Sequence, residues 1–302
     1  MNLLSGHPDS WGGSVSATDL EGKTYAGKLA AVSSDPAQVA SGQDIILLAV
    51  PGYLIEKTLS DIRPYIGDAA VGSVVSSTGF FFFAHKLIPE AKLFGFQRVP
   101  YIARVKEYGS SALLLGYKDL LLTALENIPD TQDFLQTLSE LFGTPVLKAS
   151  GWLDVSLSNS NPILHTGRLY TMFLGKEDAV FDHNILFYRE WTDEASQKLI
   201  DMDAEFFALL RELDVHAITP LLEYYESHDA ASLTRKISSI PAFQAITSPM
   251  KQVSGGWKAD CASRYFTEDF PFGLRWIKEL AVQHGLHTPV IDEVYNWGIN
   301  RI

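Results

Sequence analysis

The chain has 302 residues, of which 46% are hydrophobic and 20% charged, a balance typical of a globular protein rather than a disordered one. Its net charge of -12 argues against nucleic acid or an anionic membrane as a partner, because both require a basic surface. The presence of a single cysteine, Cys261, excludes an intrachain disulfide and a zinc site of the CxxC type. We interpret Cys261 as a buried thiol, and a nucleophile is the alternative.

No stretch of the sequence resembles a secretory signal or a membrane-spanning helix. The first residues, 1–5, lack both a basic region and a long apolar stretch. The longest apolar runs, at 45–50 and 80–84, are far shorter than the roughly 18 residues that a membrane helix requires. We therefore expect a cytoplasmic protein without a membrane partner.

Short apolar runs alternate with helical patterns over the first half of the chain. Strands are predicted at residues 44–50, 72–79, 92–96, 112–116, 120–124 and 145–149, and helices at 53–62 and 131–142. Runs that are apolar on both faces are typical of parallel strands that helices cover on both sides. The order of the elements therefore predicts an α/β, Rossmann-like doubly wound sheet.

The pattern changes near Gly151, and the rest of the chain is mostly helical in character. Helices are predicted at 193–213, where Thr192 is a suitable N-cap residue, and from Thr219, Phe272 and Pro289 onward. We place a domain boundary at about residue 150, which divides the chain into an α/β domain (1–150) and a helical domain (151–302).

Four consecutive phenylalanines, at 80–83, follow Gly79. They are typical of a strand end that leads into the buried core, and an apolar wall beside a ring-shaped cofactor is the alternative. The sequence contains no Walker A loop, G-x-S-x-G elbow, HExxH motif or EF-hand loop, and it predicts no metal site.

The segment 159–165 places one histidine near two amides. On a helix, Asn159, Asn161 and His165 would lie on broadly one side, because they are two, four and six positions apart. Histidine is the usual acid–base residue because it exchanges a proton near neutral pH. The amides could orient the imidazole or bind a substrate, and a structural or solvated histidine is the alternative.

Arg264 and Asp269 lie in a second polar segment, five positions apart. Arginine binds a carboxylate through two parallel hydrogen bonds, and aspartate can accept the second ring N–H of a histidine and fix its tautomer. A surface ion pair is the alternative. Together with His165, these groups are the ones needed to hold and reduce a 2-oxo acid.

The ends of the first predicted strands are a candidate ligand site. Ligands of open α/β sheets bind outside the carboxyl ends of the strands, where helix N-termini can meet phosphate or ribose. Val50 ends one predicted strand, Pro51 follows it, and Thr78 lies at the end of another. We expect these residues beside a cofactor, and an ordinary turn is the alternative.

Both polar segments resemble sequence blocks of the octopine/nopaline (opine) dehydrogenase family. Residues 159–165 resemble the Asn-x-Asn-Pro-x-x-His block that opens the second domain of that family, and residues 264–273 resemble its Arg…Glu-Asp-x-Pro block. Residues 98–104 are similar to its Leu-Pro-Trp-type segment, and 44–51 to its strand that leads to the nicotinamide side. The resemblance covers essentially the whole chain.

The resemblance implies an NAD(P)H-dependent oxidoreductase that reduces the imine formed between a 2-oxo acid and the amino group of an amino acid. It implies an all-helical second domain, similar to the C-terminal domain of 6-phosphogluconate dehydrogenase. His165 would be the general acid/base, Asp269 its orienting partner and Arg264 the ligand of a substrate carboxylate, with Asn159 and Asn161 beside the substrate. The resemblance leaves a homodimer open.

One part of the family pattern is missing. The first strand of the family and its glycine-rich turn have no counterpart, and residues 1–5 are similar to its second strand, so about 30 residues are absent. We expect an incomplete sheet at the N-terminus and a natural protein that starts upstream of Met1. Because Ser5-Gly6-His7 carries no acidic residue for the 2′-hydroxyl of NAD, the pattern favours NADP, with Ser5 or His7 near its phosphate.

Two other functions are left open by the sequence. The absence of the glycine-rich turn is also consistent with a catalytically inactive binding module, or with a fragment that does not bind a dinucleotide. A dehydrogenase that interconverts a 2-oxo acid and a 2-hydroxy acid, with no amine partner, is the second alternative. Binding of NADPH or NADH tests the first alternative, and the amine dependence of turnover tests the second.

Overall fold

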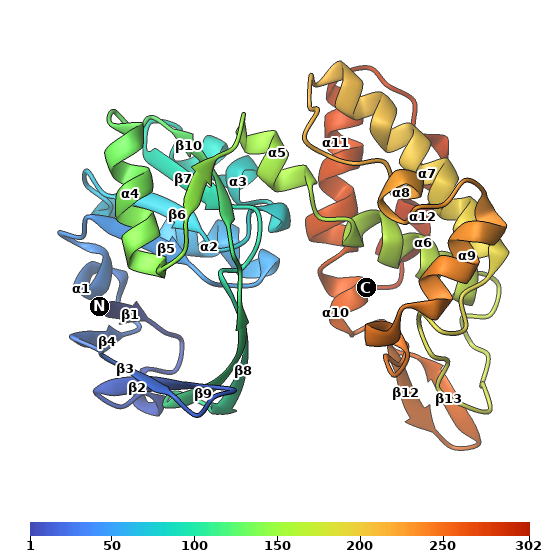
Figure 1. Cartoon of the computed structure of the whole chain (residues 1–302), viewed down its shortest axis with the longest axis horizontal. Coiled ribbons are helices and arrows are strands. Elements are labelled where there is room, and N and C mark those ends of the chain that lie inside the picture. Colours follow the sequence, from blue (N-terminus) through green and yellow to red (C-terminus); the bar gives the residue numbers. More distant parts are fainter. The chain divides into compact units, whose positions relative to one another are not determined.

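In the computed structural model, which describes residues 1–302, the chain divides into two units, Met1–Ser156 and Leu157–Ile302 (Figure 1). The boundary predicted near residue 150 precedes helix α5 (Trp152–Leu157), which spans this division. Each unit has its own core, and each is described in turn.

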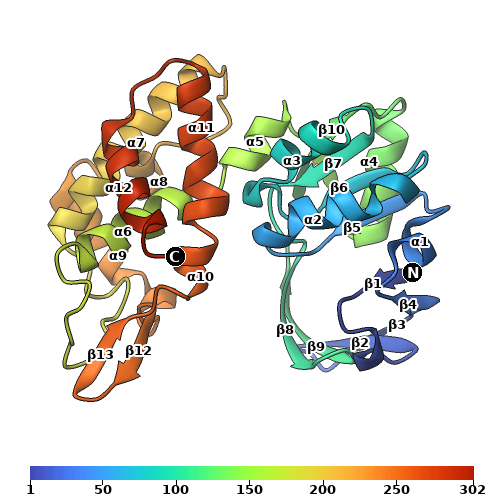
Figure 2. The same ribbon diagram turned by 180° about the vertical axis from the view of Figure 1, so that it is seen from behind.

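A five-stranded sheet with the order β11-β10-β7-β6-β5 forms the centre of the first unit. Its strands are β5 (Ile45–Leu48), β6 (Ala70–Ser73), β7 (Lys92–Phe96), β10 (Leu121–Glu126) and β11 (Val146–Lys148). The first three run parallel, whereas β10 is antiparallel to β7. Helix α4 (Thr131–Phe142) covers one face, and α2 (Gly52–Ile62) and α3 (Phe80–Leu87) cover the other (Figures 1 and 2). This arrangement confirms the predicted α/β, Rossmann-like layers.

Two glycines of this sheet leave room for aromatic rings to pack directly against its backbone. A Cβ atom on Gly72 would lie 2.3 Å from the ring of Phe94, and one on Gly95 would lie 2.6 Å from Phe81. The phenylalanine run at 80–83 opens α3, and its first two rings are fully buried. The run therefore belongs to the core, as predicted, although it lies on a helix.

The strand predicted at 72–79 was wrong in its limits. β6 ends at Ser73, and a 3-10 turn at Ser76–Thr78 follows it. The Ser73 hydroxyl donates to the carbonyl of Val75 at 2.9 Å and accepts from its N–H at 3.3 Å. These local hydrogen bonds replace the bonds that a strand would make to its neighbour in the sheet. The chain therefore leaves the sheet after Ser73 and continues through the 3-10 turn to α3.

The remaining strands of the first unit form two smaller sheets. β1 (Asn2–Leu4) pairs in parallel with β4 (Ala31–Ser33), and α1 (Pro36–Ala40) packs on both. A four-stranded sheet has the order β3 (Thr24–Lys28), β2 (Ser14–Asp19), β9 (Ser111–Tyr117) and β8 (Tyr101–Glu107). The sequence analysis did not predict β2, β3 or β8. The residues of β3 and nearly all of β8 are exposed and show no alternation of apolar and polar residues, and β2 contains only two apolar residues, Val15 and Ala17.

No strand of the chain is hydrogen-bonded between β1 and β5. Each of these strands has one neighbour, β4 and β6 respectively. In the order 3-2-1-4-5-6 they would flank the central strand 1.

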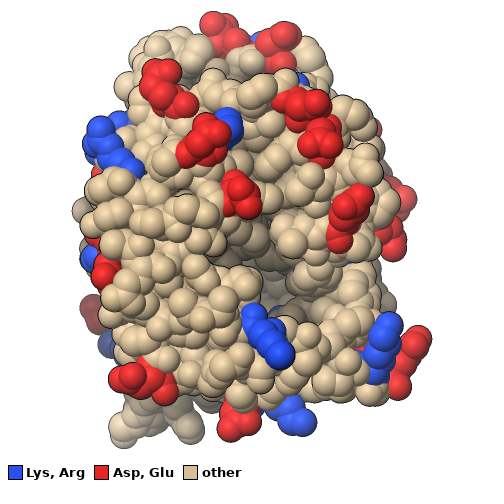
Figure 3. Space-filling view, turned by 90° about the vertical axis from the view of Figure 1, so that its left-hand side faces the viewer, with Lys and Arg blue, Asp and Glu red and all other residues tan.

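The face shown in Figure 3 is hollowed near its middle, and its basic and acidic side chains are scattered without a basic stripe.

The second unit is helical and carries one additional hairpin. Its helices are α6 (Asn161–Phe173), α7 (Asp193–Glu212), α8 (Leu221–Tyr224), α9 (Ala230–Ser239), α10 (Arg264–Thr267), α11 (Arg275–Gln283) and α12 (Pro289–Ile299), and its hairpin pairs β12 (Met250–Val253) with β13 (Gly256–Ala259). The helices predicted around 193, 272 and 289 are confirmed, whereas the one after Thr219 is a single turn. No helix is long and apolar enough to cross a membrane.

Helix α7 packs against α6 and fixes the other helices of this unit. The Thr192 side chain accepts from the Ala195 N–H at 3.2 Å, which confirms the predicted N-cap. A Cβ on Gly167 of α6 would lie 2.8 Å from Leu199, so the two helices approach closely at this glycine. The Glu205 carboxylate accepts from the first N–H groups of α12, both at 2.9 Å, and thereby fixes the start of that helix.

A partly buried carboxylate on α7, that of Asp203, makes the stability of the fold depend on pH. Asp203 accepts from the N–H of Leu221 at 3.0 Å, and burial raises its pKa to about 6. A carboxyl group whose pKa is higher in the folded state than in the unfolded state, about 3.9, destabilises the fold when it is ionised. The destabilisation is present above about pH 6 and disappears as the pH falls toward about 4.

We therefore expect Asp203→Asn to increase the free energy of unfolding at about pH 8 by on the order of 1 kcal/mol, and to leave it nearly unchanged at about pH 4. The asparagine oxygen still accepts from Leu221, but it carries no charge to desolvate. Urea unfolding at both pH values measures the difference. The control is Asp201→Asn on the same helix, and an equal loss of stability at both pH values would contradict the prediction.

Candidate active site

His165 lies in the second turn of α6 and is only 8% exposed. Pro162 occupies the first turn of this helix, where a missing N–H costs little. Asn159 lies before the helix and not on it, contrary to the sequence interpretation, because its side-chain oxygen accepts from the N–H of Asn161 at 3.1 Å. This bond closes the turn that starts α6.

Asp269 binds the Nδ1 atom of His165 at 2.8 Å, across 104 residues of sequence. Asp269 precedes a π-helical turn, Phe270–Leu274, in which the Leu274 N–H donates to the Asp269 carbonyl at 2.8 Å. A Cβ on Gly273 of this turn would lie 2.7 Å from Pro162. The proline and the glycine of the two sequence blocks therefore bring the histidine and the aspartate together.

Aromatic rings surround the imidazole. Tyr265 lies 4.6 Å from it, centre to centre, and Phe187 approaches it edge-on at 5.5 Å. The hydroxyl of Tyr188 lies 3.0 Å from the Nε2 atom. The sequence did not single out Phe187 or Tyr188, because they lie in the segment between α6 and α7, which has no regular period.

The three polar groups fix the tautomer of the histidine. An ionised carboxylate only accepts hydrogen bonds, so the Nδ1 atom of His165 is the donor to Asp269. In the neutral ring, Nε2 then carries the lone pair and accepts from the Tyr188 O–H. Burial, with smaller contributions from nearby Tyr265, Tyr225 and Asp269, raises the pKa of Tyr188 well above its ordinary value, so this hydroxyl keeps its proton.

Arg264 opens helix α10, next to Tyr265. Its side chain is exposed, and its guanidinium makes no hydrogen bond or ion pair within the chain. The guanidinium is thus free to bind a carboxylate through two hydrogen bonds. Asn161 is partly buried at the start of α6, on the same helix as His165.

The candidate cofactor residues of the first unit fall into two places. Val50 and Pro51 follow β5 and Thr78 follows β6, and these strands are parallel, so all three residues lie at the carboxyl edge of one sheet. No side chain caps the start of α2 at Pro51. This edge suits the ribose and nicotinamide part of a dinucleotide.

Ser5 and His7 follow β1, which belongs to a separate sheet. The Ser5 hydroxyl accepts from the His7 N–H at 3.1 Å and from the Trp11 indole at 3.0 Å, and His7 is exposed. No described contact links these residues to Val50 or Pro51, and their role near a phosphate stays a prediction. No group of three or more His, Cys, Asp and Glu residues could hold a metal ion.

One family model matches the part of the chain that contains nearly all of the second unit. The model described as "NAD/NADP octopine/nopaline dehydrogenase, alpha-helical domain" matches residues 148–300. The chain belongs to the NAD/NADP octopine/nopaline dehydrogenase family. It is an opine-type oxidoreductase, and the resemblance of the two polar segments to this family is confirmed.

Individual relatives and solved structures support this assignment. Octopine dehydrogenase of Mizuhopecten yessoensis is 26% identical over 291 residues, which cover 90% of this chain and 73% of the relative. Tauropine dehydrogenase of Arabella iricolor is 28% identical over 290 residues, which cover 88% and 73%. A structure of octopine dehydrogenase with NADH and L-arginine aligns with a TM-score of 0.84 at 23% identity, over 95% of this chain and 77% of that chain, and shares its fold.

We expect Asp269→Ala to lower the free energy of unfolding by about 1–3 kcal/mol, because the buried Nδ1–H of His165 would lose its acceptor. The downfield proton NMR signal of a ring N–H bound to a carboxylate should disappear at the same time. Asp260→Ala, in the same part of the chain, is the control and should retain that signal. Retention of the signal in Asp269→Ala would show that the aspartate does not hold the ring.

Proposed function

We propose that this protein reduces the imine formed between a 2-oxo acid and an amino acid, with NADPH or NADH as the reductant. The buried hydrogen bond between His165 and Asp269 is the observation that supports this proposal most strongly. Reduction of a C=N or C=O bond needs a proton at the heteroatom, and an imidazole held in one tautomer by a carboxylate supplies it.

Each polar residue of the second unit has a role in this proposal. His165 donates the proton, and Asp269 orients the ring and stabilises the imidazolium form. Arg264 binds a substrate carboxylate with its exposed guanidinium. In the sequence it directly precedes Tyr265, whose ring contacts His165. Asn161 would orient the bound substrate near the start of α6.

The first unit would hold the dinucleotide, which supplies the hydride when it is bound. Val50, Pro51 and Thr78 suit its nicotinamide side, and Ser5 and His7 would lie near its phosphates. The octopine dehydrogenase structure contains NADH, and the absence of an acidic residue at 5–7 favours NADPH for this chain. A fluorescence titration with NADPH and then NADH measures this preference.

Solved structures of a related protein support the choice of substrate classes. Two octopine dehydrogenase structures contain NADH, one with L-arginine and the other with pyruvate. We propose an amino acid and a small 2-oxo acid as the substrates of this chain. A cytoplasmic location and the absence of a nucleic acid partner stay predictions, and a homodimer remains to be tested by sedimentation.

We expect oxidation of NADPH or NADH by this protein to require both a 2-oxo acid and an amino acid, and His165→Ala to lower the turnover rate at least about 100-fold. The assay follows absorbance of the reduced nicotinamide with each substrate omitted in turn. The control is His284→Ala, an exposed histidine of the same unit that lies outside the site.

The outcomes of this assay separate the alternatives. Turnover with the oxo acid alone would indicate a dehydrogenase of 2-oxo and 2-hydroxy acids. No binding of either dinucleotide to the folded chain would indicate a binding module without catalytic activity. Unchanged turnover of His165→Ala would show that the general-acid assignment is wrong.

Arg264→Ala should raise the KM for the oxo acid at least about 10-fold, and should raise the KM for the amine much less, because the variant loses a charged bidentate contact. Arg264→Lys should recover part of this loss, since a lysine keeps the charge but not the paired geometry. Initial rates with each substrate varied in turn give both constants. Equal effects on the two constants would contradict a clamp on the oxo acid.

A further inference from the structure

The Tyr188 hydroxyl is hydrogen-bonded to the one ring nitrogen of His165 that is not bound to Asp269. The Nδ1 atom is bound to Asp269 at 2.8 Å, so Nε2 is the atom that must exchange a proton with a substrate. The Tyr188 hydroxyl lies 3.0 Å from this Nε2 atom. A substrate atom must therefore displace the hydroxyl, share Nε2 with it, or receive its proton through it.

Displacement of Tyr188 would disrupt a packed aromatic cluster. The residue is only 7% exposed, and its ring stacks on Trp191 at an interplanar angle of 7° and on Phe243 at 29°. Phe187 packs against the same ring at 4.9 Å, centre to centre. These aromatic contacts leave the ring of Tyr188 little room to rotate away from the histidine.

The backbone on both sides of Tyr188 is also held in place. Arg168, one turn after His165 on α6, donates from Nε to the Phe187 carbonyl at 3.3 Å and from Nη2 to the Glu190 carbonyl at 2.6 Å. Arg168 is 3% exposed, and burial lowers its pKa to about 10. The helix that carries the histidine therefore also fixes the position of the tyrosine.

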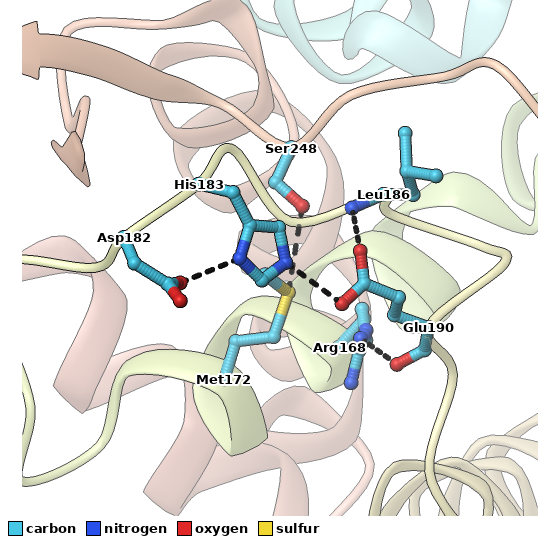
Figure 4. Close-up of polar contacts among 7 residues, drawn as sticks. All are labelled: Arg168, Met172, Asp182, His183, Leu186, Glu190 and Ser248. Carbon is cyan, nitrogen blue, oxygen red and sulfur yellow. Dashed lines mark hydrogen bonds and ion pairs between the residues drawn. The ribbon is translucent and has the colours of Figure 1, made fainter. Parts of the chain in front are cut away.

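The Glu190 side chain binds two further residues of the same segment, His183 and Leu186, as Figure 4 shows. Its carboxylate accepts from the Leu186 N–H at 2.7 Å and from Nε2 of His183 at 3.1 Å, and His183 is bound to Asp182 through its other nitrogen at 2.6 Å. Residues 182–190 are thus fixed at several points. This makes displacement of the Tyr188 hydroxyl unfavourable compared with proton transfer through it.

We propose that the Tyr188 hydroxyl carries the proton from His165 to the substrate, so that Tyr188 is a catalytic residue of the reaction proposed above. The Nε2–H bond of the imidazolium breaks and its proton moves to the tyrosine oxygen. The original O–H bond of Tyr188 breaks and that proton moves to the substrate nitrogen or oxygen. This atom would receive the electron pair of its double bond when a hydride, which a bound reduced nicotinamide would supply, adds to the adjacent carbon. The imidazolium becomes neutral imidazole, and the tyrosine is neutral before and after.

Burial favours a concerted transfer of the two protons. Because burial raises the pKa of Tyr188 well above its ordinary value, a tyrosinate would be costly, and the hydroxyl must gain one proton as it loses the other. The hydroxyl can accept from Nε2–H and donate to a second atom at the same time. If both protons move in the same step, the turnover rate should depend on the fraction of D2O in the solvent along a curve and not along a straight line.

The test compares Tyr188→Phe, Tyr225→Phe and His165→Ala in the full chain. Tyr225 is a buried tyrosine of the same unit whose hydroxyl makes no hydrogen bond within the chain, so its variant is the matched control. We expect Tyr188→Phe to lower kcat at least about 100-fold with little change in either KM, and Tyr225→Phe to retain the wild-type rate. The residual turnover rate of Tyr188→Phe should depend linearly on the fraction of D2O in the solvent, because only one proton would then be transferred.

A second measurement needs neither substrate nor dinucleotide. Nitrogen-15 NMR of labelled histidines, with the His165 signals assigned by their loss in His165→Ala, should show that Tyr188→Phe shifts the Nε2 resonance and leaves the Nδ1–H signal in place. Loss of the Nδ1–H signal would mean that the tyrosine only supports the structure, and no shift of Nε2 would mean that the hydrogen bond is absent. Either result would overturn the relay.

The rates separate this inference from the proposed function. If His165→Ala is inactive while Tyr188→Phe keeps kcat within about three-fold of the wild type, the substrate takes its proton directly from the histidine and only the relay fails. If His165→Ala keeps the wild-type rate, the proposed function fails together with the relay. Inactivity of both variants, with an intact Nδ1–H signal in Tyr188→Phe, supports the relay.

Discussion

Helix α6 buries two basic side chains one turn apart, His165 and Arg168, and residues of several other segments of the second unit bind them. A buried histidine or arginine without partners would destabilise the fold by several kcal/mol. His165 obtains one partner from Asp269 and the other from Tyr188, whereas Arg168 binds carbonyls of the segment 187–190. Because that segment serves both residues, the chemistry of the histidine and the stability of the fold depend on the same contacts.

The π-helical turn at 270–274 illustrates how backbone geometry serves the site. Such turns interrupt the regular hydrogen bonding of a helix and often lie at functional sites. Here the turn begins after Asp269 and places Gly273 so close to Pro162 that no larger residue fits between them. A second glycine, Gly298, lies against Phe270 in the same way, since a Cβ there would be 2.0 Å from the ring. The tight packing of these residues fixes the aspartate relative to the histidine.

The sequence predicted the parts of the site that depend on local pattern. The blocks that contain His165 and Asp269 could be matched to a family, and the structure brings these residues within 2.8 Å. Tyr188 could not be found, because it lies in an irregular segment and reaches the histidine only through tertiary packing. The same reasoning explains the sheets: β7 is buried and apolar and was predicted at its exact limits, whereas the exposed strands β3 and β8 carry no periodic signal.

In the function proposed above, the first unit binds the dinucleotide and the second unit supplies the proton. Every partner of the His165 ring described above comes from residues 165–269, within the second unit. The first unit contributes the carboxyl edge of β5 and β6 and the turn after β1. A change at the first-unit residues that we propose for dinucleotide binding should therefore leave the tautomer and the hydrogen bonds of His165 in place. Conversely, the proton transfer that we propose for His165, Asp269 and Tyr188 uses residues of the second unit alone, and the dinucleotide residues that we propose lie in the first unit.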